Sequence, residues 1–137
     1  MNDPQSLYAQ KLTEAEEAAD GIVDKSTLIL GMGVAMPPAF MAALAGRAHA
    51  LRNLAHLPVY YMHSNQAAAD TILAPELMDI IKPHSLFMSA HDRELEQKGR
   101  AVGKTWLQFV PCLFHQVGRL LTEAISPDYF VTTVSPM

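Results

Sequence analysis

The segment from Gly99 to Thr105 ends in the Gly-Lys-Thr triplet that binds phosphates in P-loop proteins. A P-loop has four residues between its two glycines, whereas three stand between Gly99 and Gly103. It also follows a strand and begins a helix, but this segment follows a polar, helix-like stretch and precedes an apolar one. The pattern therefore favours a turn from a helix to a strand over a nucleotide site.

Histidines are a second possible source of chemistry, because five of them repeat at intervals of seven: His49, His56, His63, His84 and His91. A helical face would be needed to bring such positions together at a metal, and Pro58 lies in a predicted strand between them. No HExxH pattern or close carboxylate accompanies them. Solvent or turn histidines are the favoured interpretation, and no metal site is predicted.

His115 and Cys112 lie where a predicted strand gives way to a helix, at the edge of a parallel sheet that usually faces a ligand. For His115 both a functional role and a hydrogen-bonded structural role stay open. Cys112 stands between a proline and a leucine with no adjacent base or cation. It is therefore predicted to be a small core residue rather than a nucleophile.

The acidic residues predict no nucleophile, acid or base within this chain. They fall on polar helical faces or in turns: Asp70, Asp79, Asp92, Glu94 and Glu96. The methionines near the predicted strand ends permit two interpretations, an adaptable apolar pocket or simple core filling. These are Met32, Met36, Met62 and Met88.

The central element that positions these residues is a strand, a glycine turn and a helix between Leu28 and Pro38. An apolar strand ends at Leu30, Gly31 and Gly33 predict a tight turn, and Pro37-Pro38 begins a helix that runs to about residue 50. The third glycine of a dinucleotide fingerprint is missing. The turn is thus predicted to face a ligand other than a dinucleotide.

Strand and helix patterns alternate along the rest of the chain. Predicted strands cover 27–30, 57–62, 85–88, 107–111 and 128–134. Predicted helices cover 13–20, with a Thr13-Glu16 capping box, 37–50, short pieces within 67–81 that end at Pro83, an exposed helix at 92–99, and 114–124. This order predicts an α/β fold with a mostly parallel sheet and helices on both faces.

Composition limits the class of partner and the compartment. The chain of 137 residues fits one domain, and its net charge of −4 gives no general attraction for nucleic acid or anionic membranes. The single cysteine forbids an internal disulfide and fits a reducing compartment. Because no signal-peptide pattern or long apolar run is seen, we expect a soluble, cytoplasmic protein.

Several segments together resemble the N-terminal part of the acetyl-CoA hydrolase/transferase family, most closely the 4-hydroxybutyrate and butyryl-CoA:acetate CoA-transferases. They are Tyr8-Ala9 with the helix that follows, Leu30 to Pro38, Phe109 to Val117, and Asp128 to Val131 with Val134 to Met137. The resemblance implies a CoA-transferase-like (NagB/RpiA/CoA-transferase-like) fold of two similar α/β domains. Residues 1–137 would then be a truncated part of the first domain, without the catalytic C-terminal domain.

In this family a glutamate of the C-terminal domain is the nucleophile, so the resemblance implies no catalytic residue here and no activity of the chain alone. Coenzyme A is implied as a substrate rather than a bound cofactor. It would be exchanged through a glutamyl-CoA thioester between an acyl-CoA and a small carboxylate such as acetate, butyrate or 4-hydroxybutyrate.

Two segments are implied to line the pocket for the substrate and CoA. The first is the glycine turn: Gly31, Met32, Gly33, Val34, Ala35 and Met36. The second is Phe114, His115 and Gln116, where Gln116 replaces the glutamate that members commonly have.

The implied partners are a catalytic C-terminal domain or subunit and further copies of the same chain. A non-catalytic subunit of a split transferase and an acyl-CoA hydrolase stay open as alternatives.

Overall fold

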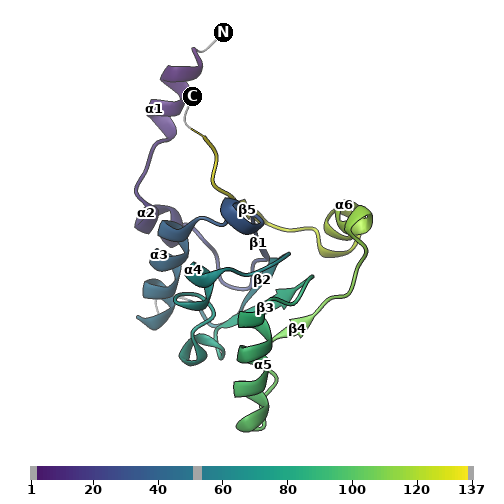
Figure 1. Cartoon of the computed structure of the whole chain (residues 1–137). Helices are drawn as coiled ribbons and strands as arrows, with labels where there is room; N and C mark the ends of the chain where they lie inside the picture. Colours follow the sequence, from purple (N-terminus) through teal and green to yellow (C-terminus); the bar gives the residue numbers. More distant parts are fainter. Residues whose placement is uncertain (1–2, 51–53, 136–137) are drawn as a thin grey trace.

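Five parallel strands form one sheet in the order β4-β3-β2-β1-β5, with helices around it (Figure 1). The computed structural model describes residues 3–50 and 54–135. The predicted α/β class is therefore confirmed, and the sheet is parallel at every pairing. The last two residues of the C-terminal Val-Ser-Pro-Met element lie outside the described residues.

The sequence order of the elements alternates as expected. The strands are β1 Leu28–Leu30, β2 Leu57–Tyr61, β3 Ile81–Ser85, β4 Gln108–Phe109 and β5 Tyr129–Val131. The helices are α1 Pro4–Lys11, α2 Ala15–Asp20, α3 Pro38–His49, α4 Gln66–Ala69, α5 Ala90–Ala101 and α6 Val117–Arg119. Short 3-10 turns cover Gly33–Ala35, Pro75–Leu77 and Phe114–Gln116, and a π-helical segment, Leu120–Ile125, continues α6.

One face of the sheet carries the hydrophobic core. Leu57, Val59 and Tyr61 alternate along β2 with less buried residues, so they point to the same face. Met41 and Leu44 of α3 are fully buried in the same cluster. The alanine-rich helix α3 packs on α2 and α4, so this face of the sheet is closed by helices.

The opposite face is covered more thinly. Ile29 and Tyr60 are partners in the ladder and lie on this face, and Tyr60 stacks on His84 with ring centroids 4.3 Å apart. Val117 of α6 and Leu121 of the π-helical segment line a groove with Ile29 and Tyr60. Figure 1 shows α6 standing to one side of the sheet, away from α3 and α4. Helices therefore lie on both faces, as predicted.

The third strand was predicted at 85–88, and this is wrong, because β3 covers 81–85 and includes Pro83. Leu86 donates its N–H to Tyr61 of β2. Since successive residues turn their N–H groups to opposite sides, the side of Pro83 that lacks an N–H faces β4. β4 begins only opposite His84, so the missing donor leaves no ladder bond unmade.

The N-terminal region also differs from the prediction. Two helices, α1 and α2, replace a single helix from residue 13, and the capping box is absent because Glu14 is the N-cap of α2. Thr13 instead donates its hydroxyl to the Glu17 carboxylate. α1 contains no buried residue and extends away from the sheet (Figure 1).

The C-terminal elements are shorter than predicted. β4 and β5 have two and three residues, and the predicted helix 114–124 is made of three consecutive helical segments. Because β4 ends at Phe109, Cys112 lies partly exposed in the following loop and is not a core residue. The segment around Gly103 connects α5 to β4, which confirms the predicted turn from helix to strand. No helix in the described ranges is long and apolar enough to cross a membrane.

A carboxylate ties two loops together before β1 and β2. Oδ1 of Asp24 accepts the N–H groups of Ala55 and His56 at 2.8 and 2.9 Å, and these bonds lower its pKa below the usual 3.8. A group with a lowered folded pKa stabilises the protein above its unfolded pKa, and this contribution is lost as the pH falls through the folded value.

We therefore predict that Asp24→Asn, which keeps the accepting oxygen but not the charge, lowers the melting temperature near neutral pH. The difference from the unmodified chain should close as the pH falls below about 3.8. Thermal unfolding followed by circular dichroism at several pH values measures this. A difference that is constant across the pH range would contradict the assignment.

Candidate functional site

The candidate site lies at the carboxyl ends of β1, β2 and β3. Because the strands are parallel, the loops that follow them meet at one edge of the sheet, where ligands of α/β proteins usually bind. These loops are residues 31–36, 62–65 and 86–89, which we name the first, second and third loops.

The first loop turns sharply at two glycines. Gly31 donates its N–H to the Val131 carbonyl at 2.9 Å, and Gly33 has a φ of 58°, in the left-handed region that favours glycine. A Cβ on Gly31 would lie 2.5 Å from the Ala35 carbonyl oxygen and also against the Thr132 hydroxyl. A side chain at Gly31 is therefore incompatible with this turn.

Two neighbours hold the first loop from either side. The Ala35 carbonyl accepts the N–H of Thr133 at 2.9 Å and the hydroxyl of Thr132 at 3.2 Å, both from the segment after β5. On the other side, Nδ2 of Asn65 donates to the Gly33 carbonyl at 3.1 Å. The same Asn65 side chain caps α4 by accepting the N–H of Ala68. The position of the first loop is thus fixed by its hydrogen-bond partners.

An apolar pocket of ≈ 390 Å³ lies between the three loops. The residues that line it come from the three loops and from the 3-10 turn before α6: Met32, Gly33, Met62, His63, Phe87 and Phe114. We name it the loop pocket. Phe114 is exposed and Met32 is 48% exposed, so apolar side chains at this edge remain open to a ligand.

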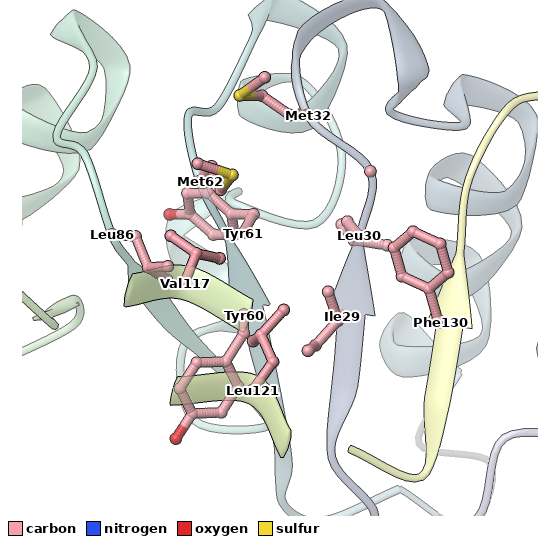
Figure 2. Close-up of a pocket in the computed structure, with 11 residues that line it drawn as sticks. Ile29, Leu30, Met32, Tyr60, Tyr61, Met62, Leu86, Val117, Leu121 and Phe130 are labelled. Carbon is pink, nitrogen blue, oxygen red and sulfur yellow. The ribbon is translucent and has the colours of Figure 1, made fainter. Parts of the chain in front are cut away.

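A second apolar space, a groove of ≈ 210 Å³, shares Met32 and Met62 with the loop pocket. Figure 2 shows Val117 and Leu121 on one side of this groove and Ile29 and Tyr60 of the sheet on the other. Leu86 and Phe130 also line it. Burial in this environment raises the pKa of the Tyr60 phenol. The phenol is therefore neutral at physiological pH, which suits an apolar wall.

The structure brings together some of the predicted site residues. Gly31 and Met32 line the groove, and Met32, Gly33 and Phe114 line the loop pocket. Val34 is 99% exposed beside them.

The other predicted residues do not line either space. Ala35 accepts the Thr132 hydroxyl with its carbonyl oxygen, and Met36 is buried in the core. His115 and Gln116 follow Phe114 and are exposed. Their predicted contact with a substrate stays a prediction.

Sequence reasoning missed a buried carboxylate beneath the loops. Asp92 was expected on an exposed helix, but it is fully buried, as the third residue of α5. It accepts hydrogen bonds from the hydroxyls of Tyr61, Ser64 and Ser85 at 2.7–3.0 Å, and from the N–H of Ser89 at 2.8 Å. Four donors compensate for the lost hydration of this carboxylate.

A signal for this arrangement was present in the sequence. Ser89 and Asp92 form a capping box, with Ser89 accepting the N–H of Asp92 at 3.0 Å. The spacing Ser-x-x-Asp before a helix predicts such a box, but not that Asp92 also faces two strands. Burial, together with the charge and the hydrogen bond of Asp92, raises the pKa of Tyr61 well above its ordinary value. Tyr61 therefore stays a hydrogen-bond donor at physiological pH.

The arrangement can bind an apolar group, but the described residues that line it supply no carboxylate, serine or cysteine nucleophile. Among the described residues that line the loop pocket and the groove, none is Asp, Glu, Ser or Cys. The one ionisable ring in the loop pocket is that of His63, which was predicted to be a turn histidine and does leave β2 in the second loop. In the described part of the chain, no group of three or more His, Cys, Asp or Glu residues is placed to hold a metal ion.

Comparison with known proteins is consistent with this geometry. A family model described as "Acetyl-CoA hydrolase/transferase N-terminal domain" matches residues 1–135. A succinyl-CoA:cyclohexane-1-carboxylate CoA transferase of Geobacter metallireducens is 34% identical over 130 residues, which are 95% of this chain and 27% of that protein.

Solved structures agree with this match. The crystal structure of RipA from Yersinia pestis has a TM-score of 0.94 at 44% identity, over 99% of this chain and 32% of that one. A mutant RipA structure has a TM-score of 0.95 at 44% identity, over 99% and 31%. The chain thus spans about a third of the length of these relatives.

The first loop provides a test with a matched glycine. We predict that Gly31→Ala destabilises the protein by about 2 kcal/mol or more, because the added methyl group meets backbone at Ala35. Gly46→Ala in α3 has open space around it and should stabilise the helix by about 0.5–1 kcal/mol. Urea unfolding measures both. Equal effects of the two substitutions on the free energy of unfolding would contradict the close contact between position 31 and the Ala35 backbone.

Proposed function

The chain belongs to the acetyl-CoA hydrolase/transferase family, and we propose that it forms the N-terminal part of a CoA-transferase acting on small carboxylic acids. The observation that carries the proposal is the loop pocket. Met32 and Gly33 of the glycine turn meet Phe114, far away in the sequence, around one apolar space at the ligand-binding edge of the sheet. The same pocket offers an acyl group a surface of methionine and aromatic side chains.

The proposed reaction takes its nucleophile from outside this chain. A glutamate of the C-terminal part attacks the thioester carbonyl of an acyl-CoA and expels the CoA thiolate, which leaves an acyl-glutamyl anhydride. The thiolate then attacks the glutamyl carbonyl and releases the first carboxylate, which gives a glutamyl-CoA thioester. An incoming carboxylate reverses the two steps and leaves as the new acyl-CoA.

The role of this chain in that scheme is to bind and orient. The first loop supplies Met32 and Gly33, the second loop Met62 and His63, and Phe114 closes the pocket. These walls keep water away from the acyl group, which favours transfer to a carboxylate over hydrolysis. Acids of the acetate, butyrate and 4-hydroxybutyrate type are the proposed substrates, and coenzyme A is exchanged rather than held as a cofactor.

The proposed partner is a C-terminal catalytic part, either on the same polypeptide or on a separate subunit, and the assembly is proposed to be a homo-oligomer. The comparison supports a separate catalytic part, because the chain spans about a third of its relatives' length. A single, partly exposed Cys112 agrees with the reducing cytoplasm as the compartment.

We predict that the pure chain of 137 residues transfers no CoA between butyryl-CoA and acetate, because no carboxylate is among the described residues that line the loop pocket and the groove. Chromatographic detection of acetyl-CoA over time measures this. Acetyl-CoA formation by the pure chain at a rate above the uncatalysed one would show that the nucleophile lies within it.

We also predict that the chain binds butyryl-CoA more tightly than free CoA, because the butyryl group is buried against Met32 and Phe114. Met32→Glu should weaken butyryl-CoA binding by about tenfold or more, since it places a charge against the acyl group. Val23→Glu is the matched control, because Val23 is 62% exposed and lines neither apolar space. Calorimetric titration measures the affinities. Equal binding of CoA and butyryl-CoA would overturn the proposed acyl site.

A further inference from the structure

Two residues adjacent in sequence, Ser64 and Asn65, connect the buried carboxylate of Asp92 to the first loop. Asn65 donates to the Gly33 carbonyl, Ser64 beside it donates to Oδ1 of Asp92 at 2.7 Å, and the Ser64 and Ser89 hydroxyls are 2.6 Å apart. Resting on the proposed function, we propose that Asp92 and Ser64 are positioning residues, which hold the three loops in the arrangement that shapes the acyl site.

The two oxygens of Asp92 each serve one strand and one loop. Oδ1 accepts from Tyr61 in β2 and from Ser64 in the second loop. Oδ2 accepts from Ser85 in β3 and from the N–H of Ser89 in the third loop. Because both oxygens are used twice and the carboxylate is fully buried, a displacement of either loop leaves a donor or an acceptor unsatisfied. The loops are therefore fixed relative to the strands that they follow.

The residues anchored in this way are direct neighbours of the pocket walls. Met62 and His63 precede Ser64, and Phe87 stands two residues before Ser89. Apolar walls have no directional contacts of their own, so their positions follow from the backbone that carries them. The hydrogen bond from Asn65 to the Gly33 carbonyl connects the first loop, and with it Met32, to the second loop. Asp92 thus holds the second and third loops directly, and Asn65 connects the second loop to the first.

A positioning role and a merely stabilising role make different demands on the donors to Asp92. A positioning role depends on the donor that lies in a loop, whereas a stabilising role depends on all of them. Ser85 lies within β3, where ladder bonds to β2 and β4 already fix its backbone. Ser64 lies in a loop, where its hydroxyl is an anchor to Asp92 and Ser89. Both serines are buried and each donates its hydroxyl to Asp92, while the Ser64 hydroxyl also bonds with that of Ser89, so both Ser→Ala substitutions should lower stability. Of the two substitutions, only the loss of the Ser64 hydroxyl frees the second loop, which carries Met62 and His63, to move.

The test compares Ser64→Ala with Ser85→Ala by two readouts. The first is the carbon-13 methyl spectrum of the methionines, in which Met32 and Met62 report on the pocket and Met41, buried on α3, reports on the core. We expect Ser64→Ala to shift or broaden the Met32 and Met62 signals and leave Met41 unchanged. Ser85→Ala should also lower the urea midpoint, with little change at Met32 and Met62.

The second readout is the affinity for butyryl-CoA. We expect Ser64→Ala to weaken it by about tenfold and Ser85→Ala to leave it nearly unchanged. Should butyryl-CoA fail to bind the unmodified chain, the proposed function falls while the methyl spectra still test the positioning role. Equal methyl changes in the two variants would overturn that role.

Asn65→Asp is a second variant, for the case in which Ser64→Ala does not fold. It keeps the oxygen that caps α4 but replaces the donor to the Gly33 carbonyl with a repelling oxygen. The Met32 methyl signal should then move more than that of Met62. An unchanged Met32 signal would show that the second loop does not hold the first.

Discussion

The arrangement of this edge of the sheet depends on the need to satisfy one buried negative charge. Asp92 is fully buried, and a carboxylate in that position requires hydrogen bonds in place of water. Its four donors come from two neighbouring strands and from the loops that follow them. Apolar packing alone tolerates small shifts between elements, whereas this set of directional contacts specifies one relative position of β2, β3 and α5.

The architecture followed from the sequence, because it depends on patterns that span many residues. The apolar run before Gly31, the prolines before α3 and the alternation of strand and helix predicted a parallel sheet with a glycine turn at its edge, and the structure contains both. Short elements were harder to place. The sequence predicts that Pro83 ends a helix, but the shortness of β4 lets this proline stand inside β3.

The candidate site was predictable only where each residue stands in a recognisable local pattern. Met32 and Gly33 followed from the glycine turn, and Phe114 from its place before a helix. Met62 is one of the methionines for which the sequence leaves both an apolar pocket and core filling open, and it lines the pocket, whereas Phe87 joins it only through the pairing of β2 with β3. Asp92 stands among charged residues on a helix with a strongly polar outer face, so its sequence neighbours indicate exposure. Its burial is a consequence of tertiary contacts with Tyr61 and Ser85.

The absence of a carboxylate from the described walls of the loop pocket and the groove agrees with the chemistry proposed for the whole enzyme. A carboxylate is a weak nucleophile when water solvates it, and it gains reactivity when its surroundings offer few hydrogen bonds to the charged form. The methionine and phenylalanine side chains of the loop pocket provide such surroundings, and His63 is the one ionisable side chain among the described residues that line it. A glutamate brought against them by another part of the protein would be desolvated only when the parts are together. Under the proposed function, the apolar walls and the nucleophile therefore act only in combination.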